Sequence, residues 1–176
     1  MEIFYINIEE FLNRYGIESL KPFLENVDFK SQKRCLEYGI GRFLLTNAAK
    51  TIYSIENPKI IINNKKPEFA NKEIEFSLSH SKDYIIAAFD KNPCGIDLEY
   101  MDNNINLEKL SKRYREKFKS IDHFYQFWTD KEAKLKLQEK PALIFYGYFK
   151  DNYRIAVTSN KEFVPHFEIK NFLEML

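Results

Sequence analysis

The middle of the sequence reads Cys94-Gly95-Ile96-Asp97-Leu98-Glu99. Apolar and polar side chains alternate along it, which is the pattern of a β-strand with one buried face. We expect Ile96 and Leu98 to pack on a core, and Asp97 and Glu99 to lie side by side on the opposite face. Adjacent carboxylates repel each other, so a cation between them would be stabilising, and paired oxygen ligands suit a hard ion such as Mg²⁺. The alternative is a strand whose polar face is simply solvated, because Asp-x-Glu on an exposed strand face is common.

Composition narrows the class of protein. The chain has 176 residues, of which 44% are hydrophobic, enough for one sizeable core or two small lobes that share an interface. A net charge of +1, from 27 basic and 26 acidic residues, argues against nucleic acid as a partner. Cys35 and Cys94 are not at metal-ligand spacing and are expected to be reduced thiols of a cytoplasmic protein.

The sequence has neither a long apolar segment nor a glycine-rich phosphate-binding motif. The N-terminus has early acidic residues and no signal-like apolar run, and no stretch approaches the ~20 apolar residues that span a bilayer, so no membrane association is predicted. Only five glycines occur, and no glycine-rich phosphate-binding loop is among them. Any bound phosphate must therefore be held by side chains and metal.

The hydrophobic spacing predicts an α+β protein in two similar halves. Strands are expected at 2–6, 59–63, 74–78, 84–89, 94–99, 143–149, 152–158 and 163–169, and helices at 8–14, 18–26, 31–53, 107–118 and 121–138. The nearly continuous apolar run 84–89 should be a central strand buried on both faces. Short turns between 74 and 99 favour an antiparallel meander there. No linker separates the halves, so we expect them to pack together as lobes 1–90 and 91–176.

The helix predicted over 121–138 adds a third carboxylate. Its apolar stripe is expected to consist of Phe124, Phe127, Trp128 and Leu135. Lys131 and Glu132 stand where this stripe calls for core residues, and buried charges are rarely tolerated unless they are paired or bound to a metal. Trp128, Glu132 and Lys136 are four residues apart, so they share one helix face. An ordinary Glu132–Lys136 pair is the simpler reading, and a metal–phosphate site the other.

A basic cluster precedes the helix at 31–53. Lys30, Lys33 and Arg34 fall within about one helical turn. They could form a local anion site or a solvated basic helix end.

Taken together, these segments resemble the paired signature of the 4′-phosphopantetheinyl transferases. The signature consists of the segments Cys94–Glu99 and Phe127-Trp128-Thr129-Asp130-Lys131-Glu132-Ala133-Lys134-Leu135-Lys136. Upstream, Phe76-Ser77-Leu78-Ser79-His80-Ser81 resembles the Asn-Ile-Ser-His-Ser segment of the surfactin-type branch, and Lys65-Lys66-Pro67 stands where that branch has Gly-Lys-Pro. The resemblance runs from about Lys30 to Lys136.

The resemblance implies an enzyme that moves the 4′-phosphopantetheine arm of coenzyme A onto a serine of an apo acyl or peptidyl carrier protein and releases adenosine 3′,5′-bisphosphate. Asp97, Glu99 and Glu132 would hold Mg²⁺ against the diphosphate of coenzyme A. Glu132 would also be the base for the carrier serine, directly or through water, and Lys136 would pair with the diphosphate. For the carrier itself, fatty-acid biosynthesis, a peptide synthetase and a polyketide synthase are all candidates.

The resemblance also assigns the nucleotide end of coenzyme A and the fold. Ser79 and His80 would hold the 3′-phosphate with Lys66 nearby, and Lys30, Lys33 or Arg34 would contact the nucleotide. The implied fold is a pseudo-twofold pair of α+β lobes, each with an antiparallel sheet and a long helix, with coenzyme A between them. About ninety residues precede Asp97, which favours the two-lobed monomer over the trimeric branch with one lobe per chain. The alternative function is a non-catalytic relative that binds a carrier protein or a nucleotide.

Overall fold

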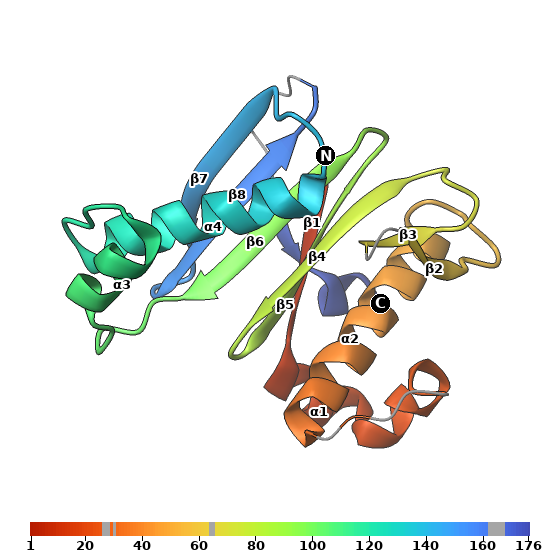
Figure 1. Ribbon diagram of the computed structural model, residues 1–176. Coiled ribbons are helices and arrows are strands. Elements are labelled where there is room, and N and C mark those ends of the chain that lie inside the picture. The colour runs from red at the N-terminus through yellow and green to blue at the C-terminus, as the bar shows by residue number, and fades with distance from the viewer. Residues whose placement is uncertain (26–28, 30, 64–65, 162–167) are drawn as a thin grey trace.

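The computed structural model describes residues 1–25, 29, 31–63, 66–161 and 168–176 (Figure 1). Its helices are α1 (Ile8–Tyr15), η1 (Ile17–Phe23), α2 (Gln32–Thr51), α3 (Leu107–Tyr114), α4 (Ile121–Leu137) and η2 (Phe172–Met175). Its strands are β1 (Glu2–Asn7), β2 (Ile60–Asn63), β3 (Lys66–Phe69), β4 (Glu75–Ser81), β5 (Tyr84–Asp90), β6 (Cys94–Tyr100), β7 (Leu143–Phe149), β8 (Tyr153–Ser159) and β9 (Ile169–Asn171). The predicted α+β class is confirmed. The strand expected at 163–169 lies mostly outside the described residues.

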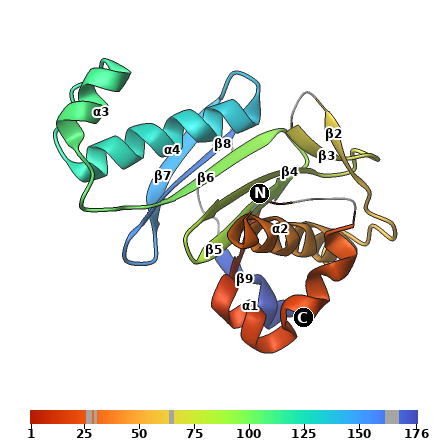
Figure 2. The ribbon, with the colours of Figure 1, turned by 60° about the horizontal axis from the view of Figure 1, so that its bottom comes forward.

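The strands form two main sheets. One has the order β4-β5-β1-β9, the other the order β6-β8-β7, and β2 and β3 make a separate antiparallel hairpin. Neighbouring strands are antiparallel except for the parallel pair β1 and β9. The long helix α2 covers the first sheet and α4 covers the second, so each half combines a sheet with a long helix (Figures 1 and 2).

The first sheet is buried on both faces, as the apolar run 84–89 predicts. On β5, Ile85, Ala87 and Phe89 belong to the core shared with α2. The alternate residues Ile86 and Ala88 belong to a second core, shared with the strands of the other sheet. The layers are therefore α2, first sheet, second sheet and α4, with an apolar core between the two sheets.

The two sheets meet at their edge strands through side chains. The predicted meander is correct for β4 and β5, but β6 does not pair with β5 and instead begins the second sheet beside β8. The hydroxyls of Ser77, Ser79 and Ser81 on β4 accept hydrogen bonds from the backbone amides of β6, at N···O distances of 2.9–3.2 Å. These hydroxyls take the place of strand carbonyls, so the amides at the edge of β6 are satisfied without merging the sheets.

The C-terminal segment returns to the first half of the molecule. Ile169, Lys170 and Asn171 pair with β1, and Phe172 and Leu173 lie in the core under α2. Residues 169–176 thus pack with the N-terminal half, whereas the expected lobe 91–176 assigns them to the other. The division into lobes 1–90 and 91–176, and the pseudo-twofold between them, remain predictions.

Helix α4 begins where Ser120 caps it, with the serine hydroxyl accepting from the amide of His123. Its buried side chains are Phe124, Tyr125, Thr129, Ala133 and Leu137. The predicted stripe is wrong at its C-terminal end, because Leu135 is 60% exposed. Lys131 is exposed as well, so no core position is taken by that charge. The small residues Thr129 and Ala133 carry the buried face because the helix backbone approaches β6 closely.

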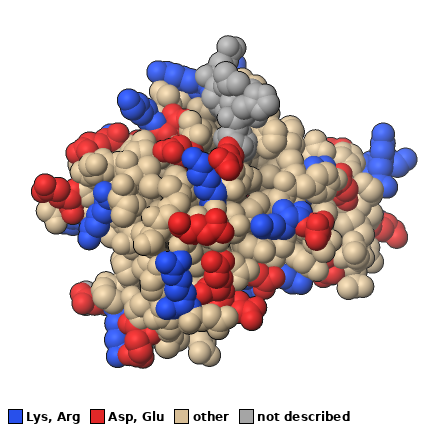
Figure 3. Space-filling model, turned by 180° about the vertical axis from the view of Figure 1, so that it is seen from behind, with Lys and Arg blue, Asp and Glu red and all other residues tan. Residues whose placement is uncertain are grey.

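Charges of both signs are mixed across the face seen in Figure 3, in keeping with the net charge of +1. None of the helices in the described ranges has the length and apolar character needed to cross a membrane.

The close approach of α4 to β6 depends on Gly95. A Cβ at this position would lie 2.1 Å from the carbonyl oxygen of Ala133 and 2.9 Å from the Thr158 methyl group. We expect Gly95→Ala to lower the free energy of unfolding by about 3 kcal/mol, because backbone must shift to admit the methyl group. Urea denaturation measures this loss.

Gly147→Ala is the matched control, because its Cβ would press on the ring edge of the Phe145 side chain rather than on backbone and would touch Ile155 at an ordinary 3.7 Å. Its loss should be about 1 kcal/mol or less. Equal stability of the two variants would contradict the proposed close packing of α4 on β6.

Candidate functional site

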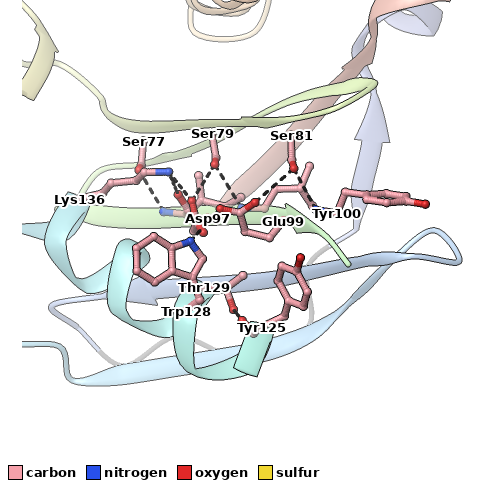
Figure 4. Close-up of polar contacts among 12 residues, drawn as sticks. Ser77, Ser79, Ser81, Asp97, Glu99, Tyr100, Tyr125, Trp128, Thr129 and Lys136 are labelled. Carbon is pink, nitrogen blue, oxygen red and sulfur yellow. Dashed lines mark hydrogen bonds and ion pairs between the residues drawn. The ribbon is translucent and has the colours of Figure 1, made fainter. Parts of the chain in front are cut away.

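The carboxylates of Asp97 and Glu99 lie between β6 and α4 (Figure 4). Alternation places them on the face of β6 opposite Ile96 and Leu98, which lie in the core between the sheets. This part of the sequence prediction is confirmed. Asp97 is only 4% exposed, so its environment is set almost entirely by neighbouring protein groups.

Helix α4 brings two polar side chains to these carboxylates. The Lys136 ammonium donates to Asp97 Oδ1 at 2.7 Å and to the Ile96 carbonyl at 3.0 Å. The Trp128 indole donates to Glu99 Oε1 at 2.9 Å. The face of α4 that carries Trp128 and Lys136 therefore contacts β6, and Glu132 lies between them on that face by its four-residue spacing.

Glu132 is half-buried, and its carboxylate makes no hydrogen bond or ion pair with any residue of the described ranges. In the described contacts, the carboxylates of Asp97 and Glu99 thus share one neighbouring ammonium, that of Lys136. That imbalance leaves negative charge at a half-buried site.

The electrostatics of Glu99 reflect this crowding. Burial, and then the neighbouring charge of Asp97, raise the pKa of the Glu99 carboxyl, while the hydrogen bonds from Trp128 and Ser81 oppose the shift. The repulsion expected from the Asp-x-Glu pattern is therefore present, and Lys136 relieves only part of it.

The fit to a divalent cation can be tested on the same residues. Asp97 Oδ2 is buried and has no hydrogen-bond partner within the described part of the chain. Carboxylate oxygens are the donors that Mg²⁺ prefers, so Asp97 and Glu99 suit it chemically. Among the described residues, however, no three His, Cys, Asp or Glu side chains approach closely enough to hold an ion. The structure brings Asp97 and Glu99 together, and Glu132 stands nearby without completing the set.

Ser79 and His80 lie on opposite faces of β4, as consecutive strand residues must. Ser79 is buried against β6, where its hydroxyl donates to Asp97 Oδ1 at 2.9 Å and accepts from the Leu98 amide at 3.2 Å. The His80 side chain is about half exposed and faces α2. The two residues predicted to hold one phosphate are therefore directed to different surroundings.

His80 is paired with an acid that the sequence prediction missed. Glu37 is 7% exposed, and its Oε1 lies 3.5 Å from His80 Nδ1 and 3.6 Å from Lys33 Nζ. Burial lowers the pKa of His80, as does the charge of Lys136, whereas Glu37 raises it. The four-residue spacing from Lys33 to Glu37 was a signal that could have identified this acid as an ion-pair partner.

Two adjoining cavities of about 410 Å³ each lie beside His80. One is lined by α2 and the hairpin, including Phe29, Arg34, Glu37, Tyr38, Arg42 and Ile62. The other is lined by Lys66, Phe76, Ser77, Leu135, Lys136 and Gln138. Both share Pro67, Leu78 and His80, so together they run from the arginines of α2 to Lys136. A larger hollow of about 590 Å³, lined by Glu9, Glu10 and Arg14 among others, contains no predicted site residue.

The remaining predicted residues fall in three places. Lys66 lines the second cavity and lies 4.0 Å from Glu75. Lys33 is exposed at the start of α2, near His80. Lys30 lies outside the described residues. The structure thus collects Lys66, His80 and Lys136 around one cavity. Lys33 lies beside Glu37, which lines the adjoining cavity.

Comparison with curated proteins identifies similar sequences. The chain is 28% identical to 4′-phosphopantetheinyl transferase psf-1 of Bacillus pumilus, over 84% of this chain and 72% of that protein. It is 24% identical to 4′-phosphopantetheinyl transferase gsp of Aneurinibacillus migulanus, over 68% of this chain and 54% of that protein. It is 34% identical to 4′-phosphopantetheinyl transferase Sfp of Bacillus subtilis, over 39% of this chain and 34% of that protein. No family model matches the sequence.

The environment of His80 yields a pH prediction. Because burial lowers its pKa, we expect the imidazole to titrate with a midpoint below 6.5. The folded state then binds this proton less readily than the unfolded chain, so stability is full above pH 6.5 and falls as pH drops through the folded-state pKa. Histidine NMR signals, assigned with His80→Asn, measure the midpoint.

Variants of neighbouring charges provide a second test of the direction of the His80 pKa shift. Glu37→Gln should lower the midpoint further and Lys136→Gln should raise it, whereas Lys72→Gln, on the exposed hairpin side, should leave it unchanged. A wild-type midpoint at or above 6.5 would contradict the burial of the imidazole.

Proposed function

We propose that the chain, which is similar to several 4′-phosphopantetheinyl transferases, is a member of that superfamily and transfers the 4′-phosphopantetheine arm of coenzyme A to a serine of an apo carrier protein. In this reaction the serine hydroxyl oxygen forms a bond to phosphorus, and the phosphorus–oxygen bond of the diphosphate breaks. Adenosine 3′,5′-bisphosphate leaves, and the serine proton passes to a base. The chain spans 54% of the length of gsp and 34% of the length of Sfp. We nevertheless propose the whole transfer reaction for this chain.

The observation that carries the proposal is the carboxylate group between β6 and α4. Asp97 and Glu99 lie there side by side (Figure 4), and Asp97 Oδ2 has no partner in the described chain. Glu132 shares a face of α4 with Trp128 and Lys136 by its four-residue spacing. We assign these three residues to a Mg²⁺ ion, which Asp97, Glu99 and Glu132 would hold. When bound there, such an ion would polarise the phosphorus under attack and neutralise charge on the leaving group.

The chain's own groups perform the remaining tasks. The Glu132 carboxylate, free of any described partner, accepts the serine proton directly or through one water. Lys136 is a cation on the same helix face and would pair with the diphosphate. Its present bond to Asp97 holds an ammonium where positive charge is needed before the ion arrives.

The nucleotide end of coenzyme A fits the two cavities. Lys66 and His80 supply cationic or hydrogen-bonding groups for the 3′-phosphate, and Arg34 with Lys33 supplies positive charge at the outer end. Tyr38, Ile62 and Pro67 offer apolar surface for a planar base. Lys30 stays a predicted contact.

Assembly and location follow from the same proposal. Both halves of the site come from one chain, so we expect a monomer. Its thiols, Cys35 and Cys94, are free, as suits a reducing cytoplasm. The second candidate, a non-catalytic relative that binds a carrier protein or a nucleotide, is disfavoured because all three carboxylates and Lys136 are present.

Transfer is tested by mass spectrometry of an apo carrier protein incubated with the protein, coenzyme A and Mg²⁺. We expect the carrier to gain one phosphopantetheine, and we expect Glu132→Gln to lower kcat by at least about 100-fold through loss of the base and of a metal ligand. Glu18→Gln is the control, an exposed acid in η1. Carrier binding that needs neither Mg²⁺ nor coenzyme A, with no mass gain on any apo carrier of the same cell, would favour the non-catalytic relative.

The 3′-phosphate assignment is tested with coenzyme A and 3′-dephospho-coenzyme A as alternative substrates. If His80 and Lys66 contact that phosphate, His80→Ala and Lys66→Ala should raise KM for coenzyme A by roughly 10-fold or more, the size of a lost charged hydrogen bond. The KM for the dephosphorylated substrate should stay within about twofold. Equal losses with both substrates would remove these residues from the 3′-phosphate site.

A further inference from the structure

The serines of β4 make three similar contacts to β6 but have different second partners. Each hydroxyl accepts a hydrogen bond from one amide, Ser77 from Ile96, Ser79 from Leu98 and Ser81 from Tyr100. Ser79 also donates to Asp97, while Ser77 has no second hydrogen bond in the described chain (Figure 4). Ser77 therefore serves only to join the two strands, whereas Ser79 joins the strands and also holds the Asp97 carboxylate.

The Ser79 hydroxyl has no donor left for a ligand. A hydroxyl has one O–H to donate, and here that hydrogen is directed to Asp97 Oδ1 at 2.9 Å. A phosphate in its ionised form only accepts hydrogen bonds, so it would have to compete with a buried carboxylate for this donor. Ser79 is 5% exposed and lies on the face of β4 opposite His80.

The effect on Asp97 is specific to one oxygen. Oδ1 receives both the Ser79 hydroxyl and the Lys136 ammonium, at 2.9 and 2.7 Å. Oδ2 is buried and has no partner among the described residues. A buried carboxylate oxygen without a donor is costly unless a cation or water approaches it.

We propose that Ser79 is a positioning residue for a divalent cation, because it fixes the Asp97 carboxylate with Oδ1 engaged and Oδ2 free to bind the ion. This inference rests on the proposed function, since it concerns the same metal site, and it assigns Ser79 to the metal in place of the 3′-phosphate. Hydrogen bonds to a ligating carboxylate commonly set its orientation, and their loss weakens metal binding by 10- to 100-fold.

The test uses Mn²⁺ alone as the probe, with no coenzyme A or carrier present. Binding to the full chain is measured from the loss of the free Mn²⁺ electron paramagnetic resonance signal. We expect Ser79→Ala to raise the Kd for Mn²⁺ at least about 10-fold, and Ser77→Ala to leave it within about twofold of wild type. Both variants lose one acceptor for a β6 amide, so thermal unfolding should show similar falls in Tm.

Ser79→Cys covers the case in which Ser79→Ala does not fold. Its thiol is a weak donor of similar shape, so the Kd should lie above wild type. Unchanged Mn²⁺ affinity in the folded Ser79 variants would overturn the positioning role while leaving the metal site in place. If the wild-type protein binds no Mn²⁺, either alone or with coenzyme A added, the metal site of the proposed function is contradicted instead.

Kinetics separate the metal role from the phosphate role. With saturating coenzyme A, the folded Ser79 variants should recover activity as Mg²⁺ is raised. They should also keep the wild-type ratio of KM values for coenzyme A and 3′-dephospho-coenzyme A. A change in that ratio without a change in Mn²⁺ affinity would contradict the metal role and support contact between Ser79 and the 3′-phosphate.

Discussion

The contact on which the site depends is the row of serine hydroxyls between two edge strands. β4 and β6 each present a repeat of two residues, and the repeats match, so alternate serines meet alternate amides. Direct backbone pairing would have joined the strands into one sheet. Side-chain acceptors instead keep the sheets separate, with an apolar core between them. The same arrangement brings a hydroxyl of one half of the molecule to a carboxylate of the other.

The charge of the site explains why α4 is placed where it is. Asp97 is almost fully buried, and an isolated carboxylate there would be strongly disfavoured. The bond from Lys136 provides one compensating charge, and the close packing made possible by Gly95 brings the helix near enough for it. Glu99 accepts hydrogen bonds from Trp128 and Ser81, but burial and the charge of Asp97 still raise the pKa of its carboxyl. The described contacts therefore place two carboxylates against one ammonium at this point.

Sequence patterns predicted the parts of this arrangement that depend on local periodicity. The strand 94–99, its two faces, the doubly buried strand 84–89 and the helix around 121–137 all follow from alternation or helical spacing. The prediction for the buried face of α4 is wrong at Leu135, because the part of the helix that packs closely on β6 buries the small residues Thr129 and Ala133. Which edge β6 would join, and the burial of Glu37 beside His80, depend on contacts between distant segments, and no local pattern reports them.

Ser79 and His80 are consecutive on β4 but have different surroundings, because a strand directs neighbouring side chains to opposite faces. Ser79 reaches the carboxylate beneath α4, and His80 reaches the cavity beside α2. A short polar strand segment can therefore reach both the buried carboxylates beside α4 and the cavity beside α2. It follows that Ser-His in such a strand cannot be read as one phosphate-binding unit from sequence alone. The register of β4 against β6, fixed by hydroxyl-to-amide bonds, determines which of its side chains meets which part of the site.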